Sequence, residues 1–295
     1  MEIGGAYPML YAFFDANGAL RRPAFVRQVE ATVASGAAGV AALGLGTEVA
    51  KLGRDERRAA VDWTAAALAG RLPLAITIPG DALPDAVEFA RFARGAGADW
   101  LILQPPRPPI GAADLIRFFG AVAAAVDCPV GVQNAPEFLG VGLTPAELAA
   151  LNAAHPNVTV VKAECAASAI PDLIAAVGPA MKVFNGRAGI ELTDNIRAGA
   201  HGMIPGIETI DAQVRIMAAM ARGDEAAAEA EYRRILPALA FAMQTLATFT
   251  LYGKRIAARR LGIDPGGSRA PADRPTAAGL AWADRYAAEL GPLPG

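Results

Sequence analysis

Val158-Thr159-Val160-Val161-Lys162 is the stretch that decides the fold, because it is a short apolar run that ends on a lysine. A continuous run of this kind predicts a strand buried on both faces, as in parallel sheets. The chain has 23 arginines and only three other lysines, Lys51, Lys182 and Lys254. A desolvated ammonium can lose its proton and attack a carbonyl, which a guanidinium cannot do. Lys162 is therefore a candidate nucleophile; the alternative is a lysine whose head simply reaches solvent.

Short apolar strands of the same kind recur along the chain and alternate with amphipathic helices. The predicted strands are residues 5–12, 38–43, 73–78, 99–104, 129–134, 158–162, 181–184 and 200–205. The predicted helices are residues 22–36, 54–70, 83–96, 111–126, 144–154, 167–177, 190–199 and 209–222. Thr144-Pro145-Ala146-Glu147 is a capping box with proline at the first helical position.

Eight β/α units predict an α/β fold of the (β/α)8 TIM-barrel class over residues 1–223. A doubly wound open sheet is the alternative, and the absence of a dinucleotide glycine fingerprint weighs against it. Residues 224–295 are predicted to form a C-terminal helical extension packed on the barrel or on a neighbouring subunit. Within it we expect one long helix or a broken pair interrupted at Pro237, a loop over 263–275 and a last helix over 276–290.

Composition narrows the classes of function. The 295 residues have a net charge near −2, a pI near 5.8 and a mean hydropathy of +0.31. The sequence has no basic stripe of the kind that binds nucleic acid or an anionic membrane. Its apolar stretches are interrupted too often to span a membrane. Two cysteines, Cys128 and Cys165, provide neither a disulfide framework nor a metal-ligand cluster. We expect a cytoplasmic protein without a signal peptide, a metal or a cofactor.

Barrel enzymes place their chemistry where strands end and the following loops begin. That rule selects Tyr11, the segment after Leu43, Gln104–Arg107, Gln133–Asn134, Lys162–Glu164, Asn185–Arg187 and Ile204–Gly206. The loop Gly44-Leu45-Gly46-Thr47-Glu48 follows the second strand, and backbone amides of such a loop can hold a carboxylate. Thr47 would add a hydroxyl donor and Glu48 would anchor the loop through backbone bonds. The alternative is an ordinary glycine turn.

Six motifs carry a resemblance to a known family. They are Gly44 to Leu52, Asp99 to Pro106, Val132-Gln133-Asn134-Ala135-Pro136, Val160-Val161-Lys162, Asn185-Gly186, and Gly199 to Ile204. In order and spacing they resemble the dihydrodipicolinate synthase / N-acetylneuraminate lyase family of class I aldolases, over nearly the whole chain. The resemblance implies a (β/α)8 barrel with a helical C-terminal extension, assembled as a homo-oligomer, either a dimer or a tetramer. It also implies that Lys162 forms an imine with a 2-oxo acid, usually pyruvate.

The resemblance implies a set of substrate-binding positions as well. They are Gly46, Thr47, Glu48, Asn134, Gly186, Ile204 and Arg107.

The departures from the family pattern concern its proton relay and its second substrate. Gln133 stands at the catalytic tyrosine, and an amide cannot relay a proton as a phenol can. Leu45 and Gly46 replace the two threonines of the glycine loop. Arg107 replaces the partner-subunit tyrosine, and Phe138 the arginine that serves the second carboxylate in synthases. A true dihydrodipicolinate synthase is therefore not expected.

Other groups could replace the missing phenol. Tyr11 ends the first strand and either points into the barrel mouth or packs under the N-terminal loop. Glu164 is either a general base on the face of Lys162 or a solvated loop charge. Arg107 binds an anionic group of the second substrate or sits at a subunit boundary.

These residues predict a Schiff-base lyase, an aldolase or dehydratase, acting on a 2-oxo acid or a 2-oxo-3-deoxy sugar acid. Its catalytic residues would be Lys162, Gln133 and Tyr11. Two alternatives stay open: a catalytically reduced barrel that binds a carbonyl metabolite without turnover, and an aldolase in which Tyr11 supplies the phenol.

Overall fold

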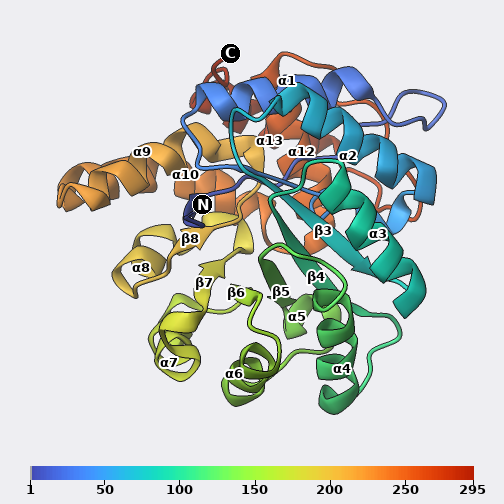
Figure 1. The fold of residues 1–295 in the computed structure, drawn as a ribbon. Helices are drawn as coiled ribbons and strands as arrows, with labels where there is room; N and C mark the ends of the chain where they lie inside the picture. Colours follow the sequence, from blue (N-terminus) through green and yellow to red (C-terminus); the bar gives the residue numbers. More distant parts are fainter. Residues whose placement is uncertain (1) are drawn as a thin grey trace.

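The structure, a computed structural model, describes residues 2–295. Eight parallel strands form one sheet in the order β1-β8-β7-β6-β5-β4-β3-β2, so each strand lies beside its neighbour in the sequence. Helices surround the strands on the outside (Figure 1). The strands are β1 (Gly5–Ala6), β2 (Val40–Ala42), β3 (Leu74–Gly80), β4 (Trp100–Pro106), β5 (Val130–Asn134), β6 (Val158–Ala163), β7 (Lys182–Asn185) and β8 (Gly202–Met203).

Backbone hydrogen bonds join the two ends of this sheet and close it. Leu10 N donates to Ala41 O at 2.9 Å, and Ala41 N donates to Pro8 O at 3.0 Å. Met9 forms parallel bridges with both Ala41 and Gly206. The (β/α)8 barrel is confirmed, and the open sheet is excluded. The first strand is shorter than predicted because Pro8 has no N–H to continue the ladder.

The helices follow the predicted units closely. They are α1 (Arg22–Ala34), α2 (Arg54–Leu68), α3 (Leu83–Gly95), α4 (Ala112–Ala123), α6 (Pro145–Ala154), α7 (Ile170–Val177), α8 (Leu192–Arg197) and α9 (Ile210–Ala221), with a short additional helix α5 (Pro136–Leu139). The capping box at Thr144 is present, because Thr144 Oγ1 accepts from Glu147 N and Glu147 Oε2 accepts from Thr144 N at 2.7 Å.

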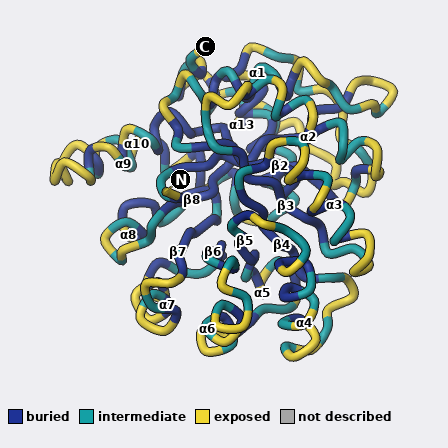
Figure 2. The backbone as a smooth tube through the Cα atoms, in the orientation of Figure 1, coloured by how far each residue is buried: buried dark blue, intermediate teal, exposed yellow. Residues whose placement is uncertain are grey.

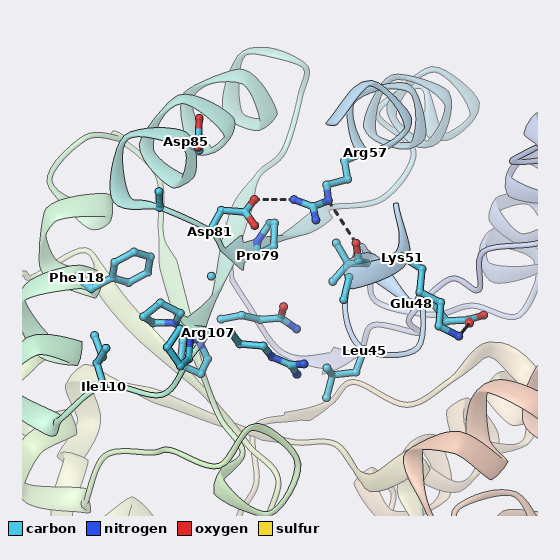
Figure 3. A pocket seen from close by; sticks show the side chains of 18 of the residues that line it. Leu45, Glu48, Lys51, Arg57, Pro79, Asp81, Asp85, Arg107, Ile110 and Phe118 are labelled. Carbon is cyan, nitrogen blue, oxygen red and sulfur yellow. Dashed lines mark hydrogen bonds and ion pairs between the residues drawn. The ribbon is translucent and has the colours of Figure 1, made fainter. Parts of the chain in front are cut away.

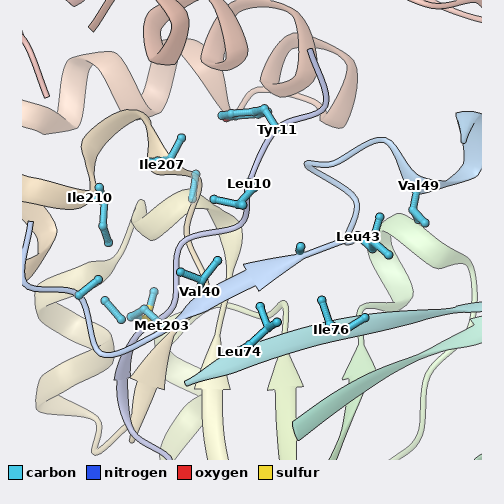
Figure 4. Packing of buried hydrophobic residues seen from close by; sticks show 14 of the residues in the cluster. Leu10, Tyr11, Val40, Leu43, Val49, Leu74, Ile76, Met203, Ile207 and Ile210 are labelled. Carbon is cyan, nitrogen blue, oxygen red and sulfur yellow. The ribbon is translucent and has the colours of Figure 1, made fainter. Parts of the chain in front are cut away.

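Two apolar layers hold the barrel together. The larger layer lies between strands and helices; Figure 4 shows part of it, where Val40, Leu74 and Ile76 pack near Leu10 and Met203. The second layer fills the barrel interior and includes Tyr7, Trp100 and Phe184, whose ring centroids lie 5.4 to 5.9 Å apart. Exposed positions are confined to the outer helices and loops (Figure 2).

Glycine makes room for this aromatic cluster. A Cβ at Gly39 would lie 2.1 Å from the Tyr7 ring, and one at Gly202 would lie 2.3 Å from the Phe184 ring. No larger residue fits at either position without moving the rings. The interior at this depth is therefore a packed plug, and open space is left only nearer the strands' carboxyl ends.

The C-terminal extension bends at a place that the sequence did not indicate. It comprises α10 (Glu225–Ala242), α11 (Leu246–Thr248), a π-helical turn (Phe249–Gly253), α12 (Lys254–Leu261) and α13 (Ala277–Leu290). Pro237 lies inside α10, so the break predicted there is wrong. The chain turns by 108° between α10 and Leu246–Leu261. Thr245 is extended and its hydroxyl caps the next helix by accepting from Thr248 N, which explains why the bend falls here.

The extension is tied to the barrel at several points. Arg27 of α1 donates to Leu261 O at the end of α12, at 3.1 Å. The predicted boundary between residues 223 and 224 falls in the link between α9 and α10 and stays a prediction. No single helix within residues 2–295 combines the length and apolar character needed to cross a membrane; the bent pair Glu225–Ala242 and Leu246–Leu261 does so only when taken together.

Candidate active site

Strand β6 positions Lys162 at the carboxyl end of the barrel. Side chains alternate along a strand, so Val160, Lys162 and Glu164 point to one side. Val160 belongs to the apolar cluster of the barrel interior, which places Lys162 and Glu164 on the interior side as well. Lys162 pairs in register with Gln133 of β5 and Phe184 of β7. The lysine therefore emerges above the aromatic plug.

Lys162 forms a buried ion pair with Glu164. The Nζ to Oε1 distance is 2.9 Å, and the two side chains are 5% and 6% exposed. No other carboxylate within residues 2–295 forms an ion pair with Lys162 Nζ, so Glu164 alone offsets its charge. The low exposure excludes the alternative in which Glu164 is a solvated loop charge.

A hydrogen-bonded chain fixes the orientation of the Glu164 carboxylate. Gln104 Nε2 donates to Gln133 Oε1 at 2.9 Å, and Gln133 Nε2 donates to Glu164 Oε1 at 3.3 Å. Arg187 N donates to the other oxygen, Oε2, at 2.9 Å. Gln133 thus acts through its amide as a positioning group for Glu164, and Glu164 is the group within proton-transfer distance of the lysine.

A small cavity of about 30 Å³ adjoins the ion pair. Its charged lining residues are Lys162, Glu164 and Arg187. The rest of its lining is Met9, Leu45, Gly46, Phe138, Ala188, Ile204, Pro205, Gly206, Met243, Leu246 and Phe249. This volume holds only two or three water molecules, at roughly 10–15 Å³ each, so a keto acid enters only if side chains of the wall move.

The glycine loop offers backbone donors to this cavity. Leu45 and Gly46 line it, and their N–H groups make no hydrogen bond within residues 2–295. Thr47 does not line it, because its hydroxyl donates to Leu10 O at 2.5 Å and its N–H donates to Gly44 O at 3.1 Å. The predicted role of the loop therefore rests on the amides of Leu45 and Gly46, and the expected Thr47 hydroxyl donor is already engaged.

Glu48 lies outside the cavity and binds two lysines. Its oxygens accept from Lys51 and Lys254, both at 2.6 Å. Lys254 also donates to Ala12 O at 3.1 Å. Glu48 thus anchors the loop through cations instead of the expected backbone bonds. Its left-handed backbone, with φ at 57°, is held by these contacts.

Tyr11 is fully buried and faces away from the Lys162 cavity. Its hydroxyl donates to Glu208 Oε2 at 2.8 Å. Burial raises the pKa of Tyr11 well above its ordinary value, and the Glu208 carboxyl adds to the effect. This placement corrects the expectation that Tyr11 points into the barrel mouth, because the phenol lies behind Gly206, 2.8 Å from where a Cβ would stand.

The remaining predicted residues divide between two places. Ile204 lines the cavity, and Gly186 packs against Glu164, whose Oε2 would lie 2.4 Å from an added Cβ. Asn134 instead clamps the following loop: it accepts from Leu143 N at 2.7 Å and donates to Leu143 O at 2.9 Å. Arg107 is exposed and lies in a separate cleft.

That cleft has a volume of about 970 Å³ and lies beside the barrel mouth. Figure 3 shows Arg57 and Asp81 facing each other on one side, joined at 2.6 Å, with Arg107 and Leu45 below them. Leu45 and Leu246 line both the cleft and the Lys162 cavity. These two leucines therefore form the wall between them.

Two charged residues of this region had no role in the sequence prediction. Arg187 follows β7, and the strand-end rule marked its position but gave no reason to prefer it. Glu208 follows β8 and is 1% exposed. Burial raises its pKa to about 7, although the hydrogen bond from Tyr11 and the positive charge of Arg260 act to lower it. Neither residue has a local sequence signal, because Arg187 contacts Glu164 and Glu208 contacts Tyr11, and both contacts join distant parts of the chain.

No group of three or more His, Cys, Asp or Glu in residues 2–295 is arranged to hold a metal.

Comparison with known proteins identifies the family. A sequence model described as the dihydrodipicolinate synthetase family matches residues 2–274. The chain belongs to this family. A 4-hydroxy-tetrahydrodipicolinate synthase from Agrobacterium fabrum is 30% identical over 243 residues, covering 79% of this chain and 80% of that protein. YagE from Escherichia coli K12, a putative 2-dehydro-3-deoxy-D-gluconate aldolase, is 31% identical over 159 residues; the match spans about half of each, 54% and 53%.

Solved structures of the family share the fold. YagE in complex with pyruvate has a TM-score of 0.89 at 24% identity and covers 98% of this chain and 99% of that chain. A putative dihydrodipicolinate synthetase from Pseudomonas aeruginosa has a TM-score of 0.90 at 24% identity and covers 98% of this chain and 100% of that chain. A catalytic lysine mutant of the Ruminococcus gnavus sialic acid aldolase has a TM-score of 0.88 at 20% identity and covers 97% and 96%.

Proposed function

We propose that this chain is a class I lyase in which Lys162 forms a Schiff base with a 2-oxo acid and Glu164 moves the protons. The observation that carries the proposal is the Lys162–Glu164 pair, 2.9 Å apart and almost fully buried beside a cavity. Membership of a family with aldolase relatives supports the lyase class. The pyruvate complex of YagE supports a 2-oxo acid as the ligand.

The pair can supply the neutral amine that condensation needs. The resting ion pair holds an ammonium, and the adjacent carboxylate is the base that takes its proton when a carbonyl arrives. The lone pair of Nζ then forms the bond to C2, and the carbonyl oxygen takes the proton back from Glu164. Glu164 then carries a proton from the nitrogen to this hydroxyl, and its loss as water leaves a protonated imine. The amides of Leu45 and Gly46 would hold the C1 carboxylate during these steps.

The imine then accepts the electron pair of a broken bond. In an aldol cleavage, Glu164 takes the proton of the C4 hydroxyl, the C3–C4 bond breaks, and its electrons form an enamine. In a dehydration, Glu164 takes a C3 proton and returns it to the C4 hydroxyl, which leaves as water. One carboxyl serves either path, so the 2-oxo-3-deoxy sugar acids remain the substrate class that we propose.

Activity as a true dihydrodipicolinate synthase is not part of the proposal. Gln133 and Phe138 stand where the resemblance places a catalytic tyrosine and a carboxylate-binding arginine. Phe138 lines the Lys162 cavity and offers no charge to a second substrate there.

Trapping with borohydride tests the Schiff base. We expect incubation with pyruvate and sodium borohydride to add one reduced pyruvate to the peptide that contains Lys162. A panel of 2-oxo-3-deoxy sugar acids then tests turnover. Absence of the adduct, or an adduct at another lysine, contradicts the proposal.

A catalytically reduced barrel that binds a carbonyl metabolite is the second candidate. It is favoured by one observation: no phenol lines the Lys162 cavity in the described chain, since Tyr11 is engaged by Glu208. Saturable binding of pyruvate, measured by calorimetry, without a borohydride adduct supports this candidate. Turnover of any sugar acid excludes it.

Assembly and location stay proposals. We propose a homo-oligomer, a dimer or a tetramer, because the resemblance implies one and Trp282 of α13 is 52% exposed. Light scattering after size exclusion measures this directly. A cytoplasmic location is supported by the two free thiols, Cys128 and Cys165, and fractionation tests it.

A further inference from the structure

Arg187 is the one charged residue of the Lys162 cavity that the proposed chemistry does not use. It lines the cavity together with Lys162 and Glu164, and the other lining side chains are apolar. Lys162 and Glu164 already neutralise each other at 2.9 Å. An additional guanidinium therefore leaves the cavity with a positive charge and with hydrogen-bond donors that match a carboxylate.

The guanidinium is only weakly engaged within the protein. Its Nη1 lies 3.3 Å from Glu191 Oε2, and the two side chains are 29% and 32% exposed. An exposed pair of this length contributes little to stability, so a ligand can displace it easily. Nε and Nη2 of Arg187 make no hydrogen bond within residues 2–295. Two donors on one edge are therefore available to a bidentate ligand.

The backbone at this position is strained, and the strain is coupled to the catalytic pair. Arg187 and its neighbour Ala188 have φ values of 52° and 56°, left-handed conformations that non-glycine residues rarely adopt. The Arg187 N–H donates to Glu164 Oε2 at 2.9 Å, which holds the turn. Strain of this kind persists where surrounding contacts fix it, and it is found at ligand sites. Here it sets the position of Arg187 relative to Glu164 and Lys162.

We infer that Arg187 binds a second carboxylate of the substrate, so that the site selects 2-oxo acids with an anionic group distant from the carbonyl. The inference rests on the proposed imine at Lys162. The C1 carboxylate has its own donors, Leu45 N and Gly46 N, on the loop after β2. Arg187 follows β7, at a different part of the cavity wall, and is partly open to solvent. The preferred substrates are therefore dicarboxylic 2-oxo acids.

The experiment compares three keto acids by borohydride trapping at Lys162. Pyruvate has no distal group, 2-oxopentanoate has a methyl group at C5, and 2-oxoglutarate has a carboxylate there. The half-saturating concentration of each is measured for the wild-type protein. We expect 2-oxoglutarate to saturate at a concentration at least about tenfold lower than 2-oxopentanoate, the size typical of one charged hydrogen-bond pair.

Two variants separate this role from a structural one. Arg187→Gln is expected to bring the ratio between the two five-carbon acids close to one, with pyruvate still trapped at Lys162. Glu191→Gln removes the competing carboxylate and is expected to raise the ratio several-fold. Retained pyruvate trapping and an unchanged melting temperature show that each variant is folded.

The outcomes are distinguishable from those of the proposed function. A ratio that stays at its wild-type value in Arg187→Gln, with pyruvate trapping intact, overturns the inference and leaves the Schiff base standing. A wild-type protein that traps no pyruvate rejects the Schiff base itself, and the inference with it.

Discussion

Residues 2–295 contain two lysine–glutamate pairs in which both side chains are almost fully buried, and the two pairs border different cavities. Lys162 and Glu164 lie 2.9 Å apart, with side chains 5% and 6% exposed. Lys254 and Glu48 lie 2.6 Å apart, with side chains 5% and 3% exposed. Burial and distance therefore do not distinguish them.

Their surroundings differ in what else each partner contacts. Glu48 also binds Lys51, and Lys254 also binds Ala12 O and lies 5.2 Å from the centre of the Phe14 ring. Burial lowers the pKa of Lys254, and the Glu48 charge opposes the shift. Lys162 has Glu164 as its single ionic partner within residues 2–295 and lines the small cavity at the carboxyl end of the barrel. The comparison teaches that a buried amine becomes a candidate nucleophile when it has few competing partners and borders the cavity at the carboxyl end of the barrel.

The largest expected effect is on adduct formation and turnover, where the two lysines should differ completely. Lys162→Met removes the nucleophile, so we expect no borohydride adduct and a loss of turnover of at least ~10³-fold. Lys254→Met, the matched control, should keep the adduct at Lys162, because the Lys254 amine binds Glu48 and Ala12 O, and none of these residues lines the Lys162 cavity. Peptide mapping by mass spectrometry and steady-state assays measure both. An adduct that persists in Lys162→Met contradicts the assignment.

The next effect concerns the acid partner. Glu164→Gln keeps the shape and one of the two hydrogen bonds that Gln133 and Arg187 donate, because only one acceptor oxygen remains, and it cannot carry a proton. We expect turnover to fall by about 10²–10⁴-fold, with the adduct still forming more slowly. Glu48→Gln is the matched control and should lower stability far more than the rate of trapping. Wild-type turnover in Glu164→Gln would assign proton transfer to another group.

Replacing Lys254 should lower the free energy of unfolding more than replacing Lys162, which is the opposite of their order in catalysis. Lys254→Met leaves Glu48 buried with only Lys51, and breaking a buried pair costs about 3–5 kcal/mol. Lys162→Met leaves Glu164 with the Arg187 N–H and the Gln133 amide, so we expect a smaller loss of about 1–3 kcal/mol. Urea unfolding at constant m-value measures both free energies. Equal losses would mean that the Lys254 pair is no more structural than the Lys162 pair.

Glu208 extends the comparison to a buried carboxyl that forms no ion pair with a lysine within residues 2–295. Burial raises its pKa from 4.5 to about 7 in the folded protein. The folded state then holds a proton that the unfolded state releases, so the stability from this group is full below pH 4.5 and is lost as the pH rises through about 7. The difference is on the order of 3 kcal/mol at most.

Glu208→Gln should remove this slope. The measurement is the free energy of unfolding of wild type minus that of the variant, between pH 4.5 and 7.5. A difference that does not change with pH would show that the carboxyl titrates normally.

Much of the fold was predictable because its signals are local. Eight apolar strands, their intervening helices and the cap at Thr144 follow from short-range periodicity and turn chemistry. The bend after α10 was not, because Pro237 is tolerated inside the helix, and the extended Thr245, eight residues after it, decides where the chain turns.

The sequence by itself determined the barrel and the lysine at the end of its sixth strand, because strand polarity and alternation fix which side chains reach the carboxyl end. Only the tertiary structure decided which groups meet there. Tyr11 turned to Glu208, 197 residues away, and Glu48 turned to Lys254, 206 residues away. The first contact forms when the barrel closes between its first and last strands, and the second forms when the C-terminal helices pack on the barrel; no spacing within a single strand or loop records them. The contact between Glu164 and Arg187 also depends on the fold. Glu164 follows β6 and Arg187 follows the neighbouring β7, so the Glu164 carboxylate can accept from the strained Arg187 N–H.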